Sequence, residues 1–207
     1  MEKKLAILVH GLGTSYTDRS VLDDLIPNLS SIGFDVVQFR YGFLSVIGAI
    51  FSNHRIAKRL HSVIQSSVDF YDHILVIGHS NGCTLMDIAS NTLHNTNKKV
   101  GYVYISPATG VSKAPGDAIS CLDVWFNPSD SVIKFIRFLM SISVIMHWSK
   151  WGLMGIYGYQ GADPRVTNFE LDADHLGWHE QHGAFFHSLH SHLEFFKERV
   201  KQKFIQV

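Results

Sequence analysis

A serine set between two glycines is the strongest chemical feature of this 207-residue sequence. The motif Gly78-His79-Ser80-Asn81-Gly82 follows the apolar run His73–Ile77 and precedes a helical pattern that starts at Cys83. A nucleophilic serine stands on a sharp, strained turn between a strand and a helix, where side chains two residues away on either side would collide. The pattern therefore predicts that Ser80 is a nucleophile. The alternative is an ordinary strand-to-helix turn with a serine cap.

Such a serine needs partners. Its hydroxyl attacks efficiently only when a histidine accepts its proton and a carboxylate fixes the tautomer of that histidine. Backbone donors must also stabilise the negative charge on the substrate oxygen. The helix expected after Ser80 points its N-terminus at this oxygen, so the N–H of Asn81 is the first donor that the sequence predicts.

A second glycine-containing loop, His10-Gly11-Leu12-Gly13-Thr14, directly follows the first apolar run. The alternative interpretation is a phosphate-binding loop. The third glycine of a dinucleotide fingerprint and the Lys-Ser/Thr pair of a P-loop are both missing, which argues against that alternative.

The two motifs and their placement resemble a small member of the α/β-hydrolase superfamily, similar to compact lipases and esterases. The resemblance covers nearly the whole chain, with the His10 loop after the first strand, the Ser80 turn after a middle strand, and an acid and a histidine after the last two strands. It implies that the N–H of Leu12 is the second oxyanion donor and that the acid precedes the histidine in the chain.

The resemblance also implies one domain over residues 1–207, no cofactor, and a small acyl ester or thioester as substrate. We expect hydrolysis through an acyl-enzyme on Ser80. The alternatives are an acyltransferase that uses the same triad and a non-catalytic interaction protein with this fold.

Asp130 is the predicted acid. It lies just past the strand-like run Cys121–Phe126, at the carboxyl end of a strand, where sites in open α/β sheets are found. The preceding Asn127-Pro128 favours a turn. The alternative role for Asp130 is a turn residue that caps the next helix. Asp123 is the rival acid, but it falls within the predicted strand.

His175 is the predicted base, because it follows the last strand and precedes the last helix. The segment His175-Leu176-Gly177-Trp178 resembles the His-Ser-Gly-aromatic signature of related enzymes. His179 is the alternative base. A different interpretation makes His175, His179 and His182 a metal site on one helical face, but Gly177 argues against a helix that begins so early.

Six apolar runs predict the strands that position these residues. Most are apolar on both faces, as in strands buried between two helical layers, and helical patterns fill the intervals between them. The chain is therefore predicted to be a doubly wound α/β domain with a mainly parallel sheet of about six strands. The runs are Lys4–Val9, Asp35–Phe39, His73–Ile77, Val100–Ile105, Cys121–Phe126 and Val166–Leu171.

The last predicted helix carries an apolar stripe at three- and four-residue steps, which indicates one long amphipathic helix. Its stripe places His182 against the sheet rather than in the site. The stripe consists of Trp178, His182, Phe185, Leu189, Leu193, Phe196 and Val200.

Residues 132–165 are predicted to be an insertion between two strands, and either a lid or an ordinary packing segment. Within it, Ile133–Trp148 is apolar, which would suit a hydrophobic acyl chain. A second apolar stretch, Phe43–Phe51, could line the same pocket.

The composition excludes several classes of protein. Lysine plus arginine and aspartate plus glutamate both number 18, so no global charge favours nucleic acid or an anionic membrane. Two cysteines make no disulfide framework, which favours a reducing, cytoplasmic location.

The N-terminal apolar run is too short for a signal peptide, and no segment reaches the roughly 18–20 apolar residues of a transmembrane helix.

Overall fold

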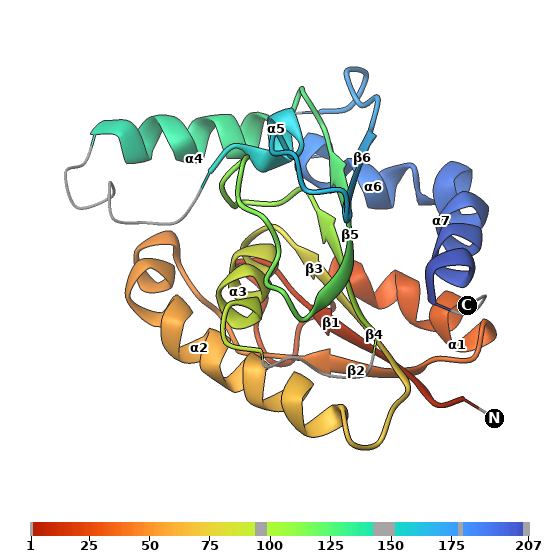
Figure 1. The fold of residues 1–207 in the computed structure, drawn as a ribbon. Coiled ribbons are helices and arrows are strands. Elements are labelled where there is room, and N and C mark those ends of the chain that lie inside the picture. Colours follow the sequence, from red (N-terminus) through yellow and green to blue (C-terminus); the bar gives the residue numbers. More distant parts are fainter. Residues whose placement is uncertain (1, 94–98, 143–151, 178–179, 205–207) are drawn as a thin grey trace.

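The fold is a six-stranded parallel sheet between two layers of helices (Figure 1). The computed structural model describes residues 2–93, 99–142, 152–177 and 180–204. Its strand order is β2-β1-β3-β4-β5-β6, and every neighbouring pair is parallel. All six predicted strands are confirmed, as β1 (Lys4–Val9), β2 (Asp35–Phe39), β3 (His73–His79), β4 (Lys99–Ile105), β5 (Ile119–Phe126) and β6 (Val166–Glu170).

Burial on both faces explains why the central strands lack an alternating pattern. In β1, Leu5, Ile7 and Val9 belong to one apolar cluster, whereas Ala6 and Leu8 belong to another on the opposite face. Each cluster is closed by its own helices. The sheet is therefore the shared wall between two cores, as a doubly wound domain requires.

One face is covered by α2 (Val46–Ser67) and α3 (Asn81–Ser90), which pack against each other as well as against the sheet (Figure 1). The other face is covered by the 3-10 helix η1 (Val21–Leu25), α1 (Ile26–Ser31), α6 (Ala184–His187) and α7 (Leu189–Phe204). The part of the chain between β5 and β6 holds α4 (Ser131–Ile142) and α5 (Met154–Tyr157).

The prediction of one continuous C-terminal helix is wrong. A 3-10 helix, η3 (Glu180–Gly183), comes first, and α6 and α7 follow with a break at Ser188. Gly183, at the first of these breaks, has poorer helix propensity than the residues around it. Phe185, Phe196 and Val200 still face the sheet core. His182 does not belong to that stripe, because η3 sets its direction independently of α7.

Within the described residues, none of the helices combines the length and hydrophobicity that spanning a bilayer requires. Cys83 and Cys121 are both free. Since the strands run parallel, the loops after β1, β3, β5 and β6 lie at the same edge of the sheet, and these are the loops that carry the predicted site residues.

Candidate active site

The Ser80 turn has the strained backbone that the motif predicted. Ser80 joins β3 directly to α3. Its backbone angles, φ 54° and ψ −120°, lie in a region that residues other than glycine rarely adopt. Its N–H donates to the carbonyl of Ile105 at 3.0 Å, and its carbonyl accepts the N–H of Cys83 at 3.1 Å. These bonds hold the turn from both sides, so the strain is supported by the surrounding fold.

Close packing explains the two glycines of the turn. A Cβ on Gly82 would lie 2.2 Å from the carbonyl oxygen of Val9, which is backbone and cannot move aside. A Cβ on Gly78 would lie 2.4 Å from Sδ of Met86. Glycine at these positions lets α3 start directly beside β1 and the loop that follows it.

The loop after β1 passes over the nucleophile. A Cβ on Gly11 would lie 3.0 Å from Cβ of Ser80, so backbone and nucleophile are in contact there. Leu12 is partly buried in a small apolar cluster around Ala49. Leu12 and Asn81 thus lie on the two segments that meet at Ser80. Their role as oxyanion donors stays a prediction.

His10 is a structural histidine whose two nitrogens are both engaged. Its Nε2 accepts the N–H of Tyr41 at 3.2 Å, so Nδ1 carries the hydrogen and donates to the carbonyl of Gly11 at 2.7 Å. The rings of His10 and Tyr41 stack with centroids 4.0 Å apart. Burial lowers the pKa of His10, which keeps it neutral. His10 therefore shapes the loop and is not available as a base.

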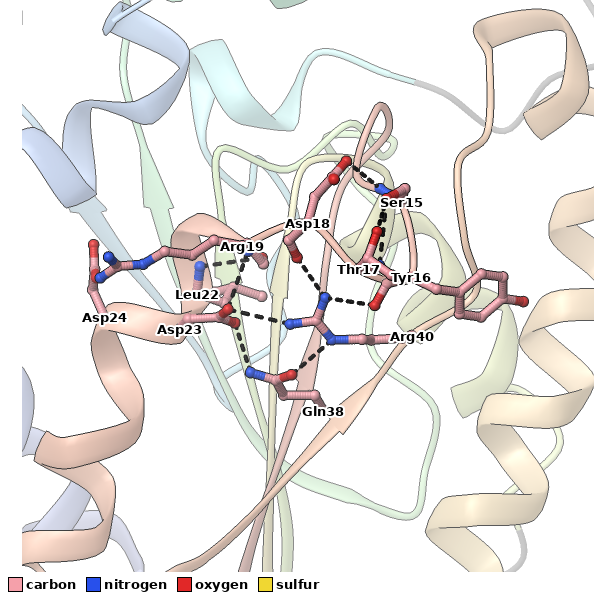
Figure 2. A network of polar contacts seen from close by, with 11 residues as sticks. Ser15, Tyr16, Thr17, Asp18, Arg19, Leu22, Asp23, Asp24, Gln38 and Arg40 are labelled. Carbon is pink, nitrogen blue, oxygen red and sulfur yellow. Dashed lines mark hydrogen bonds and ion pairs between the residues drawn. The ribbon is translucent and has the colours of Figure 1, made fainter.

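Arg40, directly after β2, clamps the far part of the same loop (Figure 2). Its Nη1 donates to the carbonyls of Tyr16 and Asp18, at 3.2 and 2.5 Å. Its Nη2 lies 3.2 Å from Oδ2 of Asp23, and its Nε donates to Gln38 at 2.7 Å. A guanidinium with so many partners holds the loop in one geometry.

Asn53, which the sequence reasoning missed, fixes the residue after the nucleophile. It lies on the buried face of α2, and its Nδ2 donates to Oδ1 of Asn81 at 2.9 Å. Nδ2 of Asn81 donates back to Oδ1 of Asn53 at 3.1 Å. A lone amide among the apolar positions of an amphipathic helix was the signal that could have revealed it.

Asp130 is fully buried at the carboxyl end of β5, and each of its carboxylate oxygens has a separate partner. Oδ1 accepts the N–H of Ile133 at 3.0 Å and so caps α4. Oδ2 lies 2.7 Å from Nδ1 of His182. The alternative interpretation of Asp130 as a helix cap is confirmed: one oxygen caps α4, and the other contacts the imidazole of His182.

His182 is the histidine that the structure brings to Asp130. A carboxylate only accepts hydrogen bonds, so Nδ1 carries the hydrogen and Nε2 is left with a lone pair. The side chain is 13% exposed, so the ring is mostly shielded but reachable. This corrects the expectation that His182 faces the sheet.

His175 is not brought to Asp130, which corrects the expected pairing of these two residues. It is exposed, in a turn where the N–H of Leu176 donates to the carbonyl of Ala173. The histidine that contacts Asp130 lies further along the chain, in η3. His179, the alternative base, lies outside the described residues. The three-histidine metal site required a helix through residues 175–182, and residues 174–176 form a turn and bend instead.

His79 supports His182 from the nucleophile turn. Its Nε2 donates to the carbonyl of His182 at 3.3 Å, and the two rings lie 4.9 Å apart. Burial, with a smaller effect from a charged His182, lowers the pKa of His79 to about 3. His79 is therefore neutral near pH 7, and it holds η3 against the turn without repelling a positive charge on His182.

Asp123, the rival acid, faces a different part of the molecule. Its carboxylate lies 3.1 Å from Nε of Arg199 and 2.9 Å from Nζ of Lys203, both on α7. These cations engage both oxygens, so Asp123 joins α7 to the sheet. Among the residues that the structure describes, no group of three histidine, cysteine or carboxylate side chains is arranged to hold a metal ion.

No protein-family model and no curated protein matches the sequence. Solved structures do share its fold. An esterase of Pyrococcus furiosus superposes with a TM-score of 0.57 at 15% identity, over 99% of this chain and 82% of that one. Inhibited Esterase B of Lactobacillus rhamnosis gives 0.52 at 16%, over 95% and 76%. A Xanthomonas campestris protein described as a putative hydrolase of the alpha/beta superfamily gives 0.51 at 14%, over 90% and 98%.

These likenesses and the six-stranded parallel sheet define the class of fold. The chain has an α/β-hydrolase-like fold in its minimal form, as the sequence motifs predicted. At such identities the likeness establishes the fold alone.

Proposed function

We propose that the protein is a serine esterase that cleaves carboxylic ester or thioester bonds, with Ser80 as nucleophile, His182 as base and Asp130 as the orienting acid. One observation carries the proposal. The 2.7 Å contact of His182 with the buried Asp130 lies at the same sheet edge as Ser80, whose φ of 54° is the strained geometry of a nucleophile turn. The solved neighbours named as esterases support the same class of reaction.

The expected reaction follows from these roles. Oγ of Ser80 attacks the acyl carbonyl while Nε2 of His182 takes the hydroxyl proton, and Asp130 stabilises the imidazolium that forms. The N–H groups of Leu12 and Asn81 would bind the oxyanion. His182 then protonates the leaving alcohol or thiol, and water, activated by His182, releases the acid. The Ser80 hydroxyl has no hydrogen bond to the described residues, and such contacts often tighten only with substrate.

An apolar cluster beside the site supports an apolar acyl group. Leu12 packs with Leu44, Val46 and Ala49 at the start of α2 and with Ile136 of α4. The stretch Phe43–Phe51 was predicted to line the pocket, and only part of it faces this cluster. The other part, which includes Phe43, Ile47 and Phe51, is exposed to solvent. That residues 132–165 act as a lid stays a prediction, and residues 143–151 lie outside the described part of the chain.

A fluorophosphonate probe with gel readout tests the nucleophile. Ser80→Ala should abolish labelling, because the probe reacts with the activated hydroxyl. Ser106→Ala is the matched control: Ser106 is the other described serine at positive φ, it follows the neighbouring strand, and it is fully buried. Labelling that persists in Ser80→Ala, or that is lost only in Ser106→Ala, would overturn the proposal.

A further inference from the structure

The chain is neutral overall, but its charges are segregated. Residues 36–68 and 131–162 contain seven lysines and arginines and no aspartate or glutamate. The rest of the chain carries all 18 acidic residues and 11 of the 18 basic ones. The two acid-free segments contain α2 and α4, which border the apolar cluster beside the site.

The exposed face of α2 changes from apolar to basic along its length. Ile47 and Phe51 are 67% and 75% exposed, and Phe43, just before the helix, is 68% exposed. At 100° per residue, Arg55 and Lys58 continue the stripe of Ile47 and Phe51, opposite the buried stripe that faces the sheet. Both are exposed. This stripe of Phe43, Ile47, Phe51, Arg55 and Lys58 is named the α2 face.

Neighbouring α4 adds charge of the same sign. It reaches the start of α2 through Ile136, which packs against the cluster around Ala49. Its Lys134 and Arg137 are exposed. Within the described part of the chain, neither these two residues nor Arg55 and Lys58 take part in an ion pair.

Several cations elsewhere in the described chain lie in ion pairs. Lys113 pairs with Asp87, Arg165 with Asp163, and Lys197 and Lys201 with glutamates one helical turn away. The α2 face thus combines unpaired cations with exposed aromatic and aliphatic side chains. Exposure of these apolar side chains to water is unfavourable. The partner that satisfies both is an anionic surface with an apolar layer beneath it.

We propose that the α2 face docks on an anionic phospholipid membrane, with Phe43, Ile47 and Phe51 entering the headgroup region and Arg55, Lys58, Lys134 and Arg137 facing lipid phosphates. Since Leu44, Val46 and Ala49 of the same segment line the cluster beside the site, docking places the site next to the lipid surface. Binding needs no catalysis, so it is independent of the proposed function.

Flotation with two kinds of vesicle tests the docking: phosphatidylcholine alone, and phosphatidylcholine mixed with phosphatidylglycerol. We expect the full chain, and equally Ser80→Ala, to float with the anionic vesicles only and to be released by salt, because the Debye length is about 10 Å at 0.1 M. Arg55→Ala with Lys58→Ala should weaken partitioning about 30-fold, since each cation contributes about fivefold. Ile47→Ser with Phe51→Ser should weaken it at least about tenfold.

Matched controls separate docking from general stickiness. Phe70→Ser removes an aromatic ring that is 70% exposed at the far end of α2, and Lys201→Glu reverses a charge on α7, across the sheet. Both should float like the unchanged chain. Equal binding to neutral vesicles, equal losses in these controls, or no flotation would overturn the proposal. Sedimentation velocity showing a dimer that Ile47→Ser with Phe51→Ser dissociates would assign the face to a second copy instead.

Discussion

Two buried aspartates on the same stretch of chain have different partners. Asp123 lies within β5 and binds Arg199 and Lys203, whereas Asp130 follows β5 and binds an imidazole. Burial is similar, since both side chains are nearly inaccessible. The difference is position: a side chain within a strand meets the helix that covers the sheet, while one past its carboxyl end meets the loops that gather there.

A buried acid is a candidate for catalysis when its partner keeps a proton-accepting atom free. The guanidinium and ammonium at Asp123 carry only donors, so that cluster can join elements but cannot take a proton. The imidazole at Asp130 keeps Nε2 with a lone pair. If this difference decides their roles, Asp130 governs activity and Asp123 governs stability.

The largest effect should come from removing that imidazole. His182→Gln should lower the kcat for p-nitrophenyl ester hydrolysis about 10³–10⁶-fold, because the hydroxyl of Ser80 loses its base. His175→Gln, the matched control in the exposed turn, should change kcat less than about threefold by the same logic. The reverse ranking would return the role of base to His175.

The next effect tests the acid. Asp130→Asn keeps the size of the side chain but removes the charge that stabilises the imidazolium, and kcat should fall about 10²–10⁴-fold. Asp123→Asn should leave kcat within about threefold of the unchanged protein. Equal losses of kcat in the two variants would mean that the distinction between the two acids is wrong.

The contribution of Asp123 should appear in the stability of the fold and not in its activity. Asp123→Asn leaves Arg199 and Lys203 without a counter-charge between α7 and the sheet, and we expect a loss of about 1–3 kcal/mol in the free energy of unfolding. Urea denaturation followed by circular dichroism measures this. An unchanged midpoint would show that water replaces the carboxylate at no cost.

The effect of pH is smallest near neutral pH and grows as the pH falls. The pKa of His79 is about 3 in the folded protein against an ordinary value of 6.5, so the unfolded chain binds a proton that the folded chain excludes. The free energy of unfolding should therefore fall as the pH drops from about 6.5 toward 3, by at most about 1.4 kcal/mol per pH unit. His79→Gln should flatten the dependence measured by urea titrations between pH 4 and 7 by about this slope. An unchanged slope would contradict the assignment.

Local pattern was enough for much of this molecule. The six strands are set by short apolar runs, and the Ser80 turn by the motif Gly78–Gly82 between a strand and a helix. The site of Asp130 follows from its position just past a strand. These features depend on residues within a few positions of one another or on the rule that parallel strands end at one edge, so the sequence by itself determines them.

Only the tertiary structure decided which histidine meets Asp130. His182 lies 52 positions from Asp130, and its direction depends on a break in helix geometry that the apolar stripe does not encode. The same holds for Asn53 and Asn81, 28 positions apart, and for the packing of Ile136 of α4 against the cluster around Ala49. Partners that are distant in sequence are selected by how loops and helices pack, and packing is a property of the whole fold.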